Sequence, residues 1–411
     1  MRFLLVGAGI GQKYIAKKIK QRGHYLIVFA YNSIPDVVDI ADEFIHLDLF
    51  DYSNVLNQAK KKCVDAVVSD QHDIFAPLVA FLAEQLHLPG NTFAALNAYC
   101  NKNCYRANCD KLGIPVPKHM EIKTPEIPKE FIDVPFPWIV KPADSQSSVG
   151  VKKVASVEEC VVAIKEALSF SRSKTAIVEE FFEGKELVAE GFIWKGKYFN
   201  LGYADRVYFN LKDLFIPAQT IFPSTVSKKV LDKVFESESK MASYISPNFA
   251  IVHSEYLYNP DTYDICVVES ALRGGGVYIS SHLIPLYTNI DLNDILLDAA
   301  EGKIIDMPSI LKYREDKAAA YVCFYLPEGK ILSVEGIEKI KKDKAVALAE
   351  LDSLKIDSVV HKIEHKGQRL GPIIVKSDNR ENLEDEIKRV QGLLSVKMDC
   401  VSDTLNSINW N

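Results

Sequence analysis

The first 97 residues constrain the fold more than any other part of the chain, because short β-branched runs alternate there with helical patterns. The expected strands are residues 3–6, 25–30, 44–46 and 66–69, and the expected helices are residues 13–22, 52–62 and 74–86. Alternation of strands and helices implies parallel strand pairing, with helices on both faces of the sheet. The N-terminal region is therefore predicted to be a parallel α/β domain.

Two further units are expected after residue 97. A helix from about residue 98 ends at Gly113, because Pro115 and Pro117 force the chain into an extended exit. The middle unit has expected strands at residues 138–141, 176–179, 187–194, 249–257 and 264–269, and a helix over 155–168 that Ser156 opens. The last unit has expected strands at residues 319–326, 345–351 and 372–376, and a helix over 381–394. The predicted domains are thus 1–97, 98–310 and a strand-rich α+β domain over 311–411.

Composition excludes several classes of protein. Lys and Arg number 49 against 55 Asp and Glu, a net charge of −6, and there is no long basic run to indicate a nucleic-acid or membrane partner. No apolar stretch reaches the 18 or so residues of a membrane span, and the apolar start predicts a buried strand rather than a secretion signal. The eight cysteines include no CxxC pair, so free thiols in a reducing compartment, the cytoplasm, are expected.

A glycine turn, Gly7-Ala8-Gly9-Ile10-Gly11, joins the first expected strand to the first expected helix. Such a turn can approach an anion closely. A nicotinamide site would also need an acidic residue at the end of the second strand, where the chain has no carboxylate until Asp36. A structural turn, or a pocket for part of a substrate, is therefore favoured over dinucleotide binding.

A strand over residues 138–141 delivers Lys141 to a loop of small residues that contains Ser147, Ser148 and Gly150. The N–H groups and hydroxyls of such a loop can close over a polyphosphate, and the lysine adds a positive charge. Taken alone, this pattern is more typical of a simple hairpin.

An acidic linker follows about thirty residues later. A strand over residues 176–179 runs into Glu179, Glu180, Phe181 and Phe182, and Glu186 opens the next strand. The linker backbone and one carboxylate could bond a purine, while a second carboxylate could hold the ribose hydroxyls. The alternative is a solvated acidic turn.

Two acidic residues, Glu255 and Glu269, lie on neighbouring expected strands around the turn at residues 259–262. A hairpin would place both carboxylates on one face, a set of hard oxygen donors suited to Mg²⁺ with phosphates. Arg273 and the backbone of Gly275 follow closely and could stabilise an oxyanion and an expelled phosphate.

This ordered set, with Lys102 on the helix before it, resembles the ATP-grasp superfamily of carboxylate–amine ligases. The resemblance covers about residues 1–310 and implies an ATP-grasp fold with an N-terminal Rossmann-like (pre-ATP-grasp) domain and a lid subdomain over about 125–187. The last hundred residues are similar, more loosely, to the extra domain of L-amino acid (dipeptide-forming) ligases.

The resemblance implies a role for each matching position. Lys102 and Lys141 would contact ATP phosphates beneath a lid loop of Ser147, Ser148 and Gly150. Glu179 and the backbone of Glu180, Phe181 and Phe182 would hold the adenine, and Glu186 the ribose. Glu255 and Glu269 would bind Mg²⁺, with Mn²⁺ as a substitute. Arg273, with Gly275, would stabilise the transferring phosphoryl group.

Two other side chains have open interpretations. His253 shares a strand face with Glu255, so it lines the nucleotide pocket or is a packed histidine. Arg206 is a triphosphate or carboxylate contact, or else part of a surface ion pair.

One departure from the family pattern concerns the metal. The family commonly has Glu-x-Asn where this chain has Glu269-Ser270-Ala271, and the Ala271 methyl group cannot bind a cation. A single Mg²⁺ would then dominate, or Ser270, water or phosphate oxygens would complete a second site. A non-catalytic ATP-binding protein that retains the fold is therefore the alternative to a ligase.

The implied reaction activates a small-molecule carboxylate as an acyl phosphate and joins it to an amine, with release of ADP and phosphate. The resemblance also implies a homodimer. The substrates are expected to meet residues 69–73, 273–276 and 280–282, where strands end and loops begin.

Overall fold

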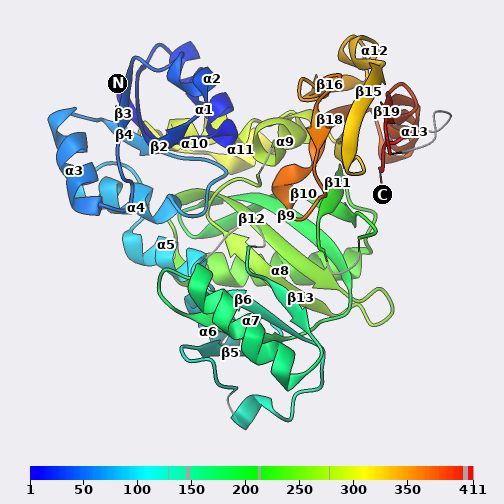
Figure 1. The fold of residues 1–411 in the computed structure, drawn as a ribbon. Helices are drawn as coiled ribbons and strands as arrows, with labels where there is room; N and C mark the ends of the chain where they lie inside the picture. The colour runs from blue at the N-terminus through cyan, green and yellow to red at the C-terminus, as the bar shows by residue number, and fades with distance from the viewer. Residues whose placement is uncertain (128, 145–148, 212–213, 277, 401–405, 411) are drawn as a thin grey trace.

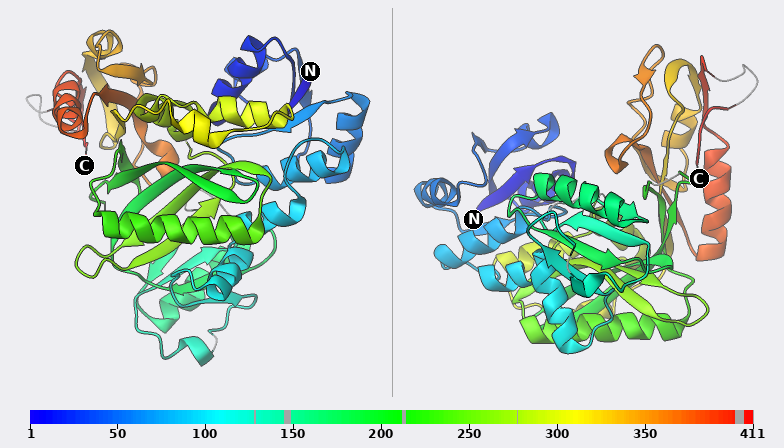
Figure 2. Two further views of the ribbon diagram at one scale, coloured as in Figure 1. Left: turned by 180° about the vertical axis from the view of Figure 1, so that it is seen from behind. Right: turned by 60° about the horizontal axis from the view of Figure 1, so that its bottom comes forward.

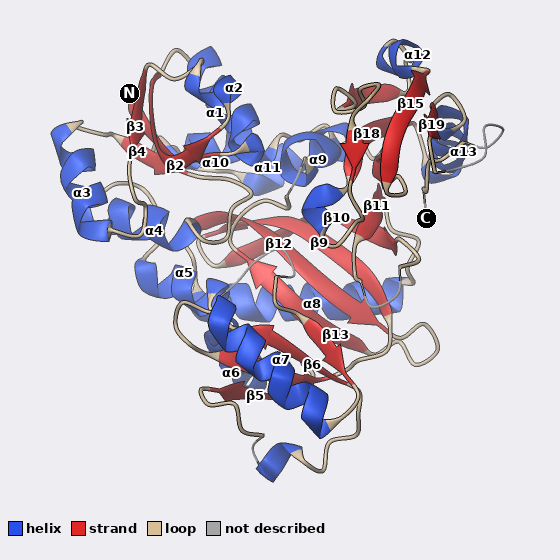
Figure 3. Ribbon diagram, viewed as in Figure 1, coloured by secondary structure: helices blue, strands red, loops and turns tan. Residues whose placement is uncertain are grey.

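A computed structural model describes residues 1–127, 129–144, 149–211, 214–276, 278–400 and 406–410. The predicted lid residues Ser147 and Ser148 lie outside these ranges. The described strands pair into four sheets, arranged as shown in Figure 1 and, by secondary structure, in Figure 3.

The N-terminal sheet is parallel, in the order β3-β2-β1-β4. Its elements are β1 (Arg2–Ala8), β2 (Tyr25–Ser33), β3 (Glu43–His46) and β4 (Ala66–Val68), with α1 (Lys13–Gln21), α2 (Pro35–Val38), α3 (Tyr52–Lys61) and α4 (Ala76–Gln85). Alternate residues of β1 enter two different cores: Phe3 and Leu5 pack with α1, whereas Leu4 and Val6 pack with α3 and α4. Both faces of the sheet are covered, which confirms the α/β prediction.

The single helix predicted from residue 98 is two helices, α5 (Phe93–Cys100) and α6 (Lys102–Leu112). The break lies at Asn101, whose side-chain oxygen accepts hydrogen bonds from the N–H groups of Asn103 and Cys104 and so caps α6. Gly113, at φ +62°, ends α6 as predicted. Lys102 is thereby the first residue of a helix.

A small antiparallel sheet with one covering helix lies at the bottom of Figure 1, over part of the predicted lid. Its elements are β5 (His119–Ile122), η2 (Lys129–Phe131), β6 (Trp138–Pro142), β7 (Lys152–Val154), α7 (Val157–Phe170) and β8 (Ala176–Glu180), in the strand order β5-β8-β6-β7. We call this unit the lid sheet. Helix α7 packs Cys160, Ile164 and Ala167 onto the sheet, and the Ser156 side chain caps it as predicted.

The largest sheet has the order β13-β12-β9-β10-β11-β14-β18-β16, with antiparallel neighbours throughout. Its strands are β9 (Lys185–Trp194), β10 (Lys197–Tyr208), β11 (Pro217–Phe222), β12 (Phe249–Tyr258), β13 (Ile265–Ala271), β14 (Ala318–Phe324), β16 (Val346–Ala349) and β18 (Leu370–Ser377). Figure 2 shows α8 (Lys228–Ile245) crossing one face of this sheet. Strands β10 and β11 and helix α8 are not among the elements predicted from the sequence.

The opposite face of the large sheet shares a continuous core with the N-terminal unit. This core joins α1, which follows η1 (Ile10–Gln12), to η3 (Ile279–Leu283), α9 (Ile284–Thr288), α10 (Leu292–Ala300) and α11 (Met307–Leu311). Polar contacts reinforce the junction, since Lys18 of α1 and Arg22, directly after α1, both pair with Asp294 of α10. The N-terminal unit is thus held against the helices that follow β13.

The C-terminal residues add a three-stranded sheet, β17-β15-β19, to one end of the molecule. Its elements are β15 (Gly329–Glu335), α12 (Ile337–Lys341), β17 (Val359–Val360), η4 (Lys366–Gln368), α13 (Arg380–Gln391) and β19 (Ser395–Met398). Because β11 pairs with β14, strands from both sides of residue 310 share one sheet, and the predicted domain limits stay a prediction. None of the described helices has the length and hydropathy to cross a membrane.

Candidate functional site

The two predicted metal carboxylates lie on the β12–β13 hairpin. The Asn259 side chain accepts hydrogen bonds from the N–H groups of Asp261 and Thr262, which closes the turn between the strands. Across the hairpin Glu255 and Glu269 are direct partners, so their side chains project from the same face. The hairpin prediction is confirmed.

Each of these carboxylates holds a cation from another element. Lys102 Nζ lies 3.4 Å from Glu269 Oε1, and Arg206 of β10 lies 2.6 Å from Glu255 Oε1. Within the described ranges, no three His, Cys, Asp or Glu side chains already have the arrangement of a metal site. Two facing carboxylates nevertheless suit Mg²⁺, which proteins usually hold through one or two carboxylates together with substrate phosphates.

Glu255 belongs to a buried chain of charges across three strands. Arg206 pairs with both Glu255 and Glu186, at 2.6 and 2.9 Å, and the Tyr208 hydroxyl also donates to Glu186. Burial raises the pKa of Glu255, but Arg206 and His253 outweigh it and hold this pKa well below its usual range. Burial raises the pKa of Glu186 despite Arg206. Glu186, the predicted ribose contact, is therefore a buried carboxylate that is paired with Arg206.

His253 continues this chain. Its Nε2 lies 3.4 Å from Glu255 Oε1, and its Nδ1 faces Glu190 Oε1 on β9. Glu190 is completely buried, and it is the cross-strand partner of His253. The structure thus places His253 beside Glu255, on the predicted face, and adds Glu190, which the sequence analysis missed.

Lys141 lies in a second cluster, within the lid sheet. It pairs at 2.6 Å with Glu179 on the neighbouring strand β8, and Arg106 of α6 pairs with the same carboxylate at 2.8 Å. Burial would raise the pKa of Glu179, but Arg106 and Lys141 lower it to about 2. Burial lowers the pKa of Lys141. Glu179, predicted to meet adenine, already carries two ion pairs.

Arg106 was missed by the sequence analysis, although a signal existed. It follows Lys102 by four residues, so both side chains project from the same side of α6. The two cations reach different carboxylates, Glu269 on β13 and Glu179 on β8. Helix α6 thus bridges the large sheet and the lid sheet.

The predicted hinge joins β8 to β9. The N–H of Glu180 donates to Lys118 O and that of Phe181 donates to Pro137 O, which ties the end of β8 into the lid sheet. Phe181 also lies under the Lys153 ammonium group, and Phe182 follows in the linker. Gly150, at φ +74°, follows the undescribed part of the loop and packs against Pro142.

The loop after β13 is clamped to the end of β4 by two aspartates. Asp73 accepts two hydrogen bonds from the Arg273 guanidinium, at 2.6 and 3.0 Å. Asp70 is completely buried and accepts from Gly274 N, Ser280 Oγ and Asn293 Nδ2, each at 2.9 Å. The segments around residues 70, 273 and 280 therefore meet at one place.

The glycines of this loop allow a close approach. A Cβ atom on Gly275 would lie 2.1 Å from Glu190 Oε1 and 2.7 Å from His253 Nδ1. Only a residue without a side chain can hold the backbone so near the Glu190–His253 pair. The loop that carries Arg273 thus lies directly against the charged chain of β9 and β12.

The N-terminal glycine turn meets the same region through Gln12. The Gln12 side chain accepts from Gly9 N–H at 3.1 Å and donates to Asp70 O at 2.6 Å, so the turn contacts the end of β4. Asp36, the first acidic residue after β2, pairs with Lys13. These contacts favour a structural turn beside the site over a dinucleotide site.

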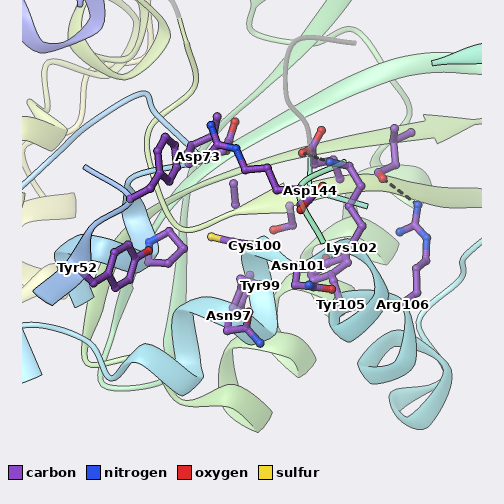
Figure 4. A pocket seen from close by; sticks show the side chains of 18 residues that line it. Tyr52, Asp73, Asn97, Tyr99, Cys100, Asn101, Lys102, Tyr105, Arg106 and Asp144 are labelled. Carbon is purple, nitrogen blue, oxygen red and sulfur yellow. Dashed lines mark hydrogen bonds and ion pairs between the residues drawn. The ribbon is translucent and has the colours of Figure 1, made fainter. Parts of the chain in front are cut away.

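A cavity of about 240 Å³ opens beside Lys102. Its walls come from the N-terminal unit, α5, α6, β13 and the lid side, through residues that include Phe50, Tyr52, Asp73, Asp144, Arg172 and Glu269. Figure 4 shows Lys102 and Asp144 at one end and Tyr52 at the other. The Arg172 guanidinium stacks 3.3 Å from the centre of the Phe50 ring, so the lid side contacts the N-terminal unit.

A further cation reaches the site from the C-terminal residues. Lys366 of η4 is strongly desolvated, which lowers its pKa, and it interacts electrostatically with Glu255 and Glu269. It lies almost one hundred residues after Glu269 in sequence. No local pattern marks it, because long-range contacts hold this segment: β18 pairs with β14, and Arg369 donates to Pro217 O at the start of β11.

Comparison with known proteins relates this chain to ligases. Residues 109–193 match the family described as D-ala D-ala ligase C-terminus. A D-alanine–D-alanine ligase of Azobacteroides pseudotrichonymphae is 26% identical over 187 residues, 43% of this chain and 57% of that protein. A formate-dependent phosphoribosylglycinamide formyltransferase of Ignicoccus hospitalis is 26% identical over 192 residues, 45% of this chain and 48% of that protein. The chain spans about half the length of these curated relatives.

Solved structures resemble nearly the whole chain. The L-amino acid ligase from Bacillus licheniformis matches with a TM-score of 0.82 at 18% identity, over 97% of this chain and 98% of that one. The phosphoribosylglycinamide synthetase from Anaerococcus prevotii matches with a TM-score of 0.77 at 18% identity, over 97% and 99%. At these identities the likeness establishes the fold, and it extends through the C-terminal residues.

Proposed function

We propose that this chain, which has the fold of the ATP-grasp enzymes, is an ATP- and Mg²⁺-dependent carboxylate–amine ligase. It would activate a small-molecule carboxylate as an acyl phosphate, join it to an amine and release ADP and phosphate. The observation that carries this proposal is the meeting of Glu255 and Glu269 across one hairpin, with Lys102 on the second carboxylate.

The nucleotide would lie between the lid sheet and the β12–β13 face. Lys102 and Lys141 each have a carboxylate partner, and triphosphate oxygens would take its place at the ammonium groups. Glu255 and Glu269 would then face the cation. When bound, Mg²⁺ neutralises phosphate charge and polarises the phosphoryl group that is transferred. Glu179, Glu186 and the linker between them would hold the nucleoside.

The reacting groups would meet beside the clamped loop. A carboxylate oxygen of the acid would attack the γ-phosphorus of ATP, and ADP would leave. The amine nitrogen would then attack the acyl carbon, and phosphate would leave from a tetrahedral intermediate. Arg273, oriented by Asp73, would stabilise the negative charge in both steps, with the backbone of Gly275 beside it.

The lid side would keep water from the acyl phosphate. The cavity beside Lys102 is smaller than the 300–1,000 Å³ of typical ligand pockets, so the nucleotide would require the lid sheet to move. The Arg172–Phe50 stack is a contact that such a movement would break and closure would restore. A cytoplasmic location, a homodimer and small-molecule substrates complete the proposal.

The test is product analysis with the purified chain, ATP, Mg²⁺ and pooled carboxylic acids and amines. The proposal predicts ADP and phosphate in equal amounts, only when an acid is present. AMP with pyrophosphate would overturn the acyl-phosphate route. Tight ATP binding with no substrate-dependent ADP would instead identify a non-catalytic ATP-binding protein.

A further inference from the structure

We propose that His253 is a metal ligand, whose Nε2 takes the position that Ala271 cannot fill beside Glu255 and Glu269. A nitrogen donor at this position raises the affinity of the site for Mn²⁺ relative to Mg²⁺. The inference rests on the proposed function, because it names a further ligand of the same metal–nucleotide site.

The hairpin register places His253 opposite Ala271. The two residues are direct cross-strand partners, one step along the same face from the Glu255–Glu269 pair. The four side chains thus form two adjacent rows, with His253 and Glu255 on β12 and Ala271 and Glu269 on β13. His253 on β12 therefore supplies the metal donor that Ala271, its cross-strand partner on β13, lacks.

The imidazole is oriented as a ligating imidazole would be. Nδ1 faces the buried Glu190 carboxylate, and Nε2 points to Glu255, lying 3.4 Å from Oε1. Metal-bound histidines almost always donate their other ring N–H to a carboxylate or carbonyl, which fixes the tautomer and raises the basicity of the ligating nitrogen. With its proton on Nδ1, His253 presents the Nε2 lone pair to the hairpin face.

Among the described residues, the Glu190 side chain has no hydrogen-bond partner other than His253. Its Oε2 has no hydrogen-bond partner among the described residues, its Oε1 faces the imidazole, and a Cβ on Gly275 would lie 2.1 Å from that oxygen. A completely buried carboxylate is costly unless a partner compensates it. His253 is that partner, and the loop at Gly275 closes over the pair.

The competing explanation is a structural ion pair, in which a protonated His253 donates to both Glu190 and Glu255. That arrangement leaves no lone pair for a cation. The two explanations therefore differ in whether nitrogen enters the coordination sphere. They also differ in metal preference, since imidazole favours transition-metal ions whereas Mg²⁺ is bound through oxygen.

The experiment is pulsed EPR of Mn²⁺ bound to the full chain with the β,γ-methylene analogue of ATP. The expected result is ¹⁴N modulation from a directly bound imidazole, which changes when the protein is labelled with [¹⁵N]histidine. It should vanish in His253→Gln and persist in the matched control His361→Gln, an exposed histidine outside the site. The Kd for Mn²⁺ should rise about tenfold or more in His253→Gln, and the Kd for Mg²⁺ less.

The outcomes separate the two proposals. Bound Mn²⁺ without histidine modulation overturns this inference and leaves the proposed function intact. No nucleotide-dependent Mn²⁺ binding overturns both. The labelling experiment uses the unmodified sequence, so it gives a result even if His253→Gln does not fold.

Discussion

Glu255 and Glu269 are direct cross-strand partners, yet each carboxylate is neutralised by a cation from a different element: Arg206 from β10 and Lys102 from α6. The hairpin therefore gathers negative charge at one point, and the rest of the chain supplies matching positive charge. Such a cluster has the charges that a metal–triphosphate complex requires, since phosphates can replace carboxylates at the cations and a metal can replace cations at the carboxylates.

Glu269→Gln tests the role of this pair. The amide keeps the shape of the side chain but binds a cation poorly, so ADP formation should fall by about 100-fold or more. The measurement is a steady-state assay of ADP release over a range of Mg²⁺ concentrations. Glu236→Gln, an exposed change on α8, is the control and should keep normal activity. Equal activity in the two variants would show that Glu269 does not take part in the reaction.

Gly275→Ala tests the close approach of the clamped loop. The added methyl group would lie 2.1 Å from Glu190 Oε1, so the loop must shift and carry Arg273 with it. We expect a loss of at least about tenfold in kcat. Gly276→Ala is the matched comparison, because its Cβ would lie 3.5 Å from the nearest heavy atom, and it should lose less. A larger loss in Gly276→Ala would contradict this account.

Asp70→Ala tests the clamp on the same loop. The substitution leaves the donors on Gly274, Ser280 and Asn293 without their shared acceptor in a buried place. The free energy of unfolding should fall by about 2–4 kcal/mol, and kcat should fall with it. Urea unfolding measures the free energy of unfolding, with Asp232→Ala on the surface of α8 as the control. An unfolding energy within about 0.5 kcal/mol of the unchanged protein would show that the clamp is dispensable.

The lowered pKa of Glu179 implies that the stability of the fold depends on pH. Its pKa is lowered from 4.5 to about 2 in the folded protein, because Arg106 and Lys141 outweigh the effect of burial. A depressed pKa stabilises the fold fully above the unfolded value near 4.5, and this contribution, about 3 kcal/mol, is lost as the pH falls toward 2.

Urea unfolding of the unchanged protein and of Glu179→Gln between pH 7 and pH 3 measures that contribution. The unchanged protein should be more stable at pH 7, and the difference should stay constant down to about pH 5 and then narrow. A difference that does not change below pH 4.5 would show that Glu179 is not held ionised by its two partners.

Local sequence patterns were sufficient to predict the elements whose buried residues form a continuous apolar run or are flanked by a recognisable turn. The strands at β1, β2 and β4 are continuous apolar runs with helices on both faces, and the turn at Asn259 fixed the hairpin that pairs Glu255 with Glu269. Strand β10 was missed because polar residues such as Arg206 face a buried charged site rather than solvent. That exception removes the alternation on which strand prediction depends.

The partners of the site residues could not be predicted. The sequence indicated Glu179 and Arg273 but not that they pair with Arg106 and Asp73, and it did not indicate that Asp70 accepts from Gly274 N–H. Those contacts join segments far apart in the chain. Glu190 carries no sequence signal at all, since a lone acid in an apolar strand resembles an ordinary surface residue. Its burial depends on β9 lying between β10 and β12 in the sheet.

The transfer of a carboxylate oxygen to phosphate tests the central claim most directly. The purified chain is incubated with ATP, Mg²⁺, amines and amino acids whose carboxylates carry ¹⁸O, and the released phosphate is examined by ³¹P NMR. Attack of the carboxylate on the γ-phosphorus predicts one ¹⁸O atom in each phosphate formed with the amide product. Product formation with unlabelled phosphate would contradict the acyl-phosphate mechanism.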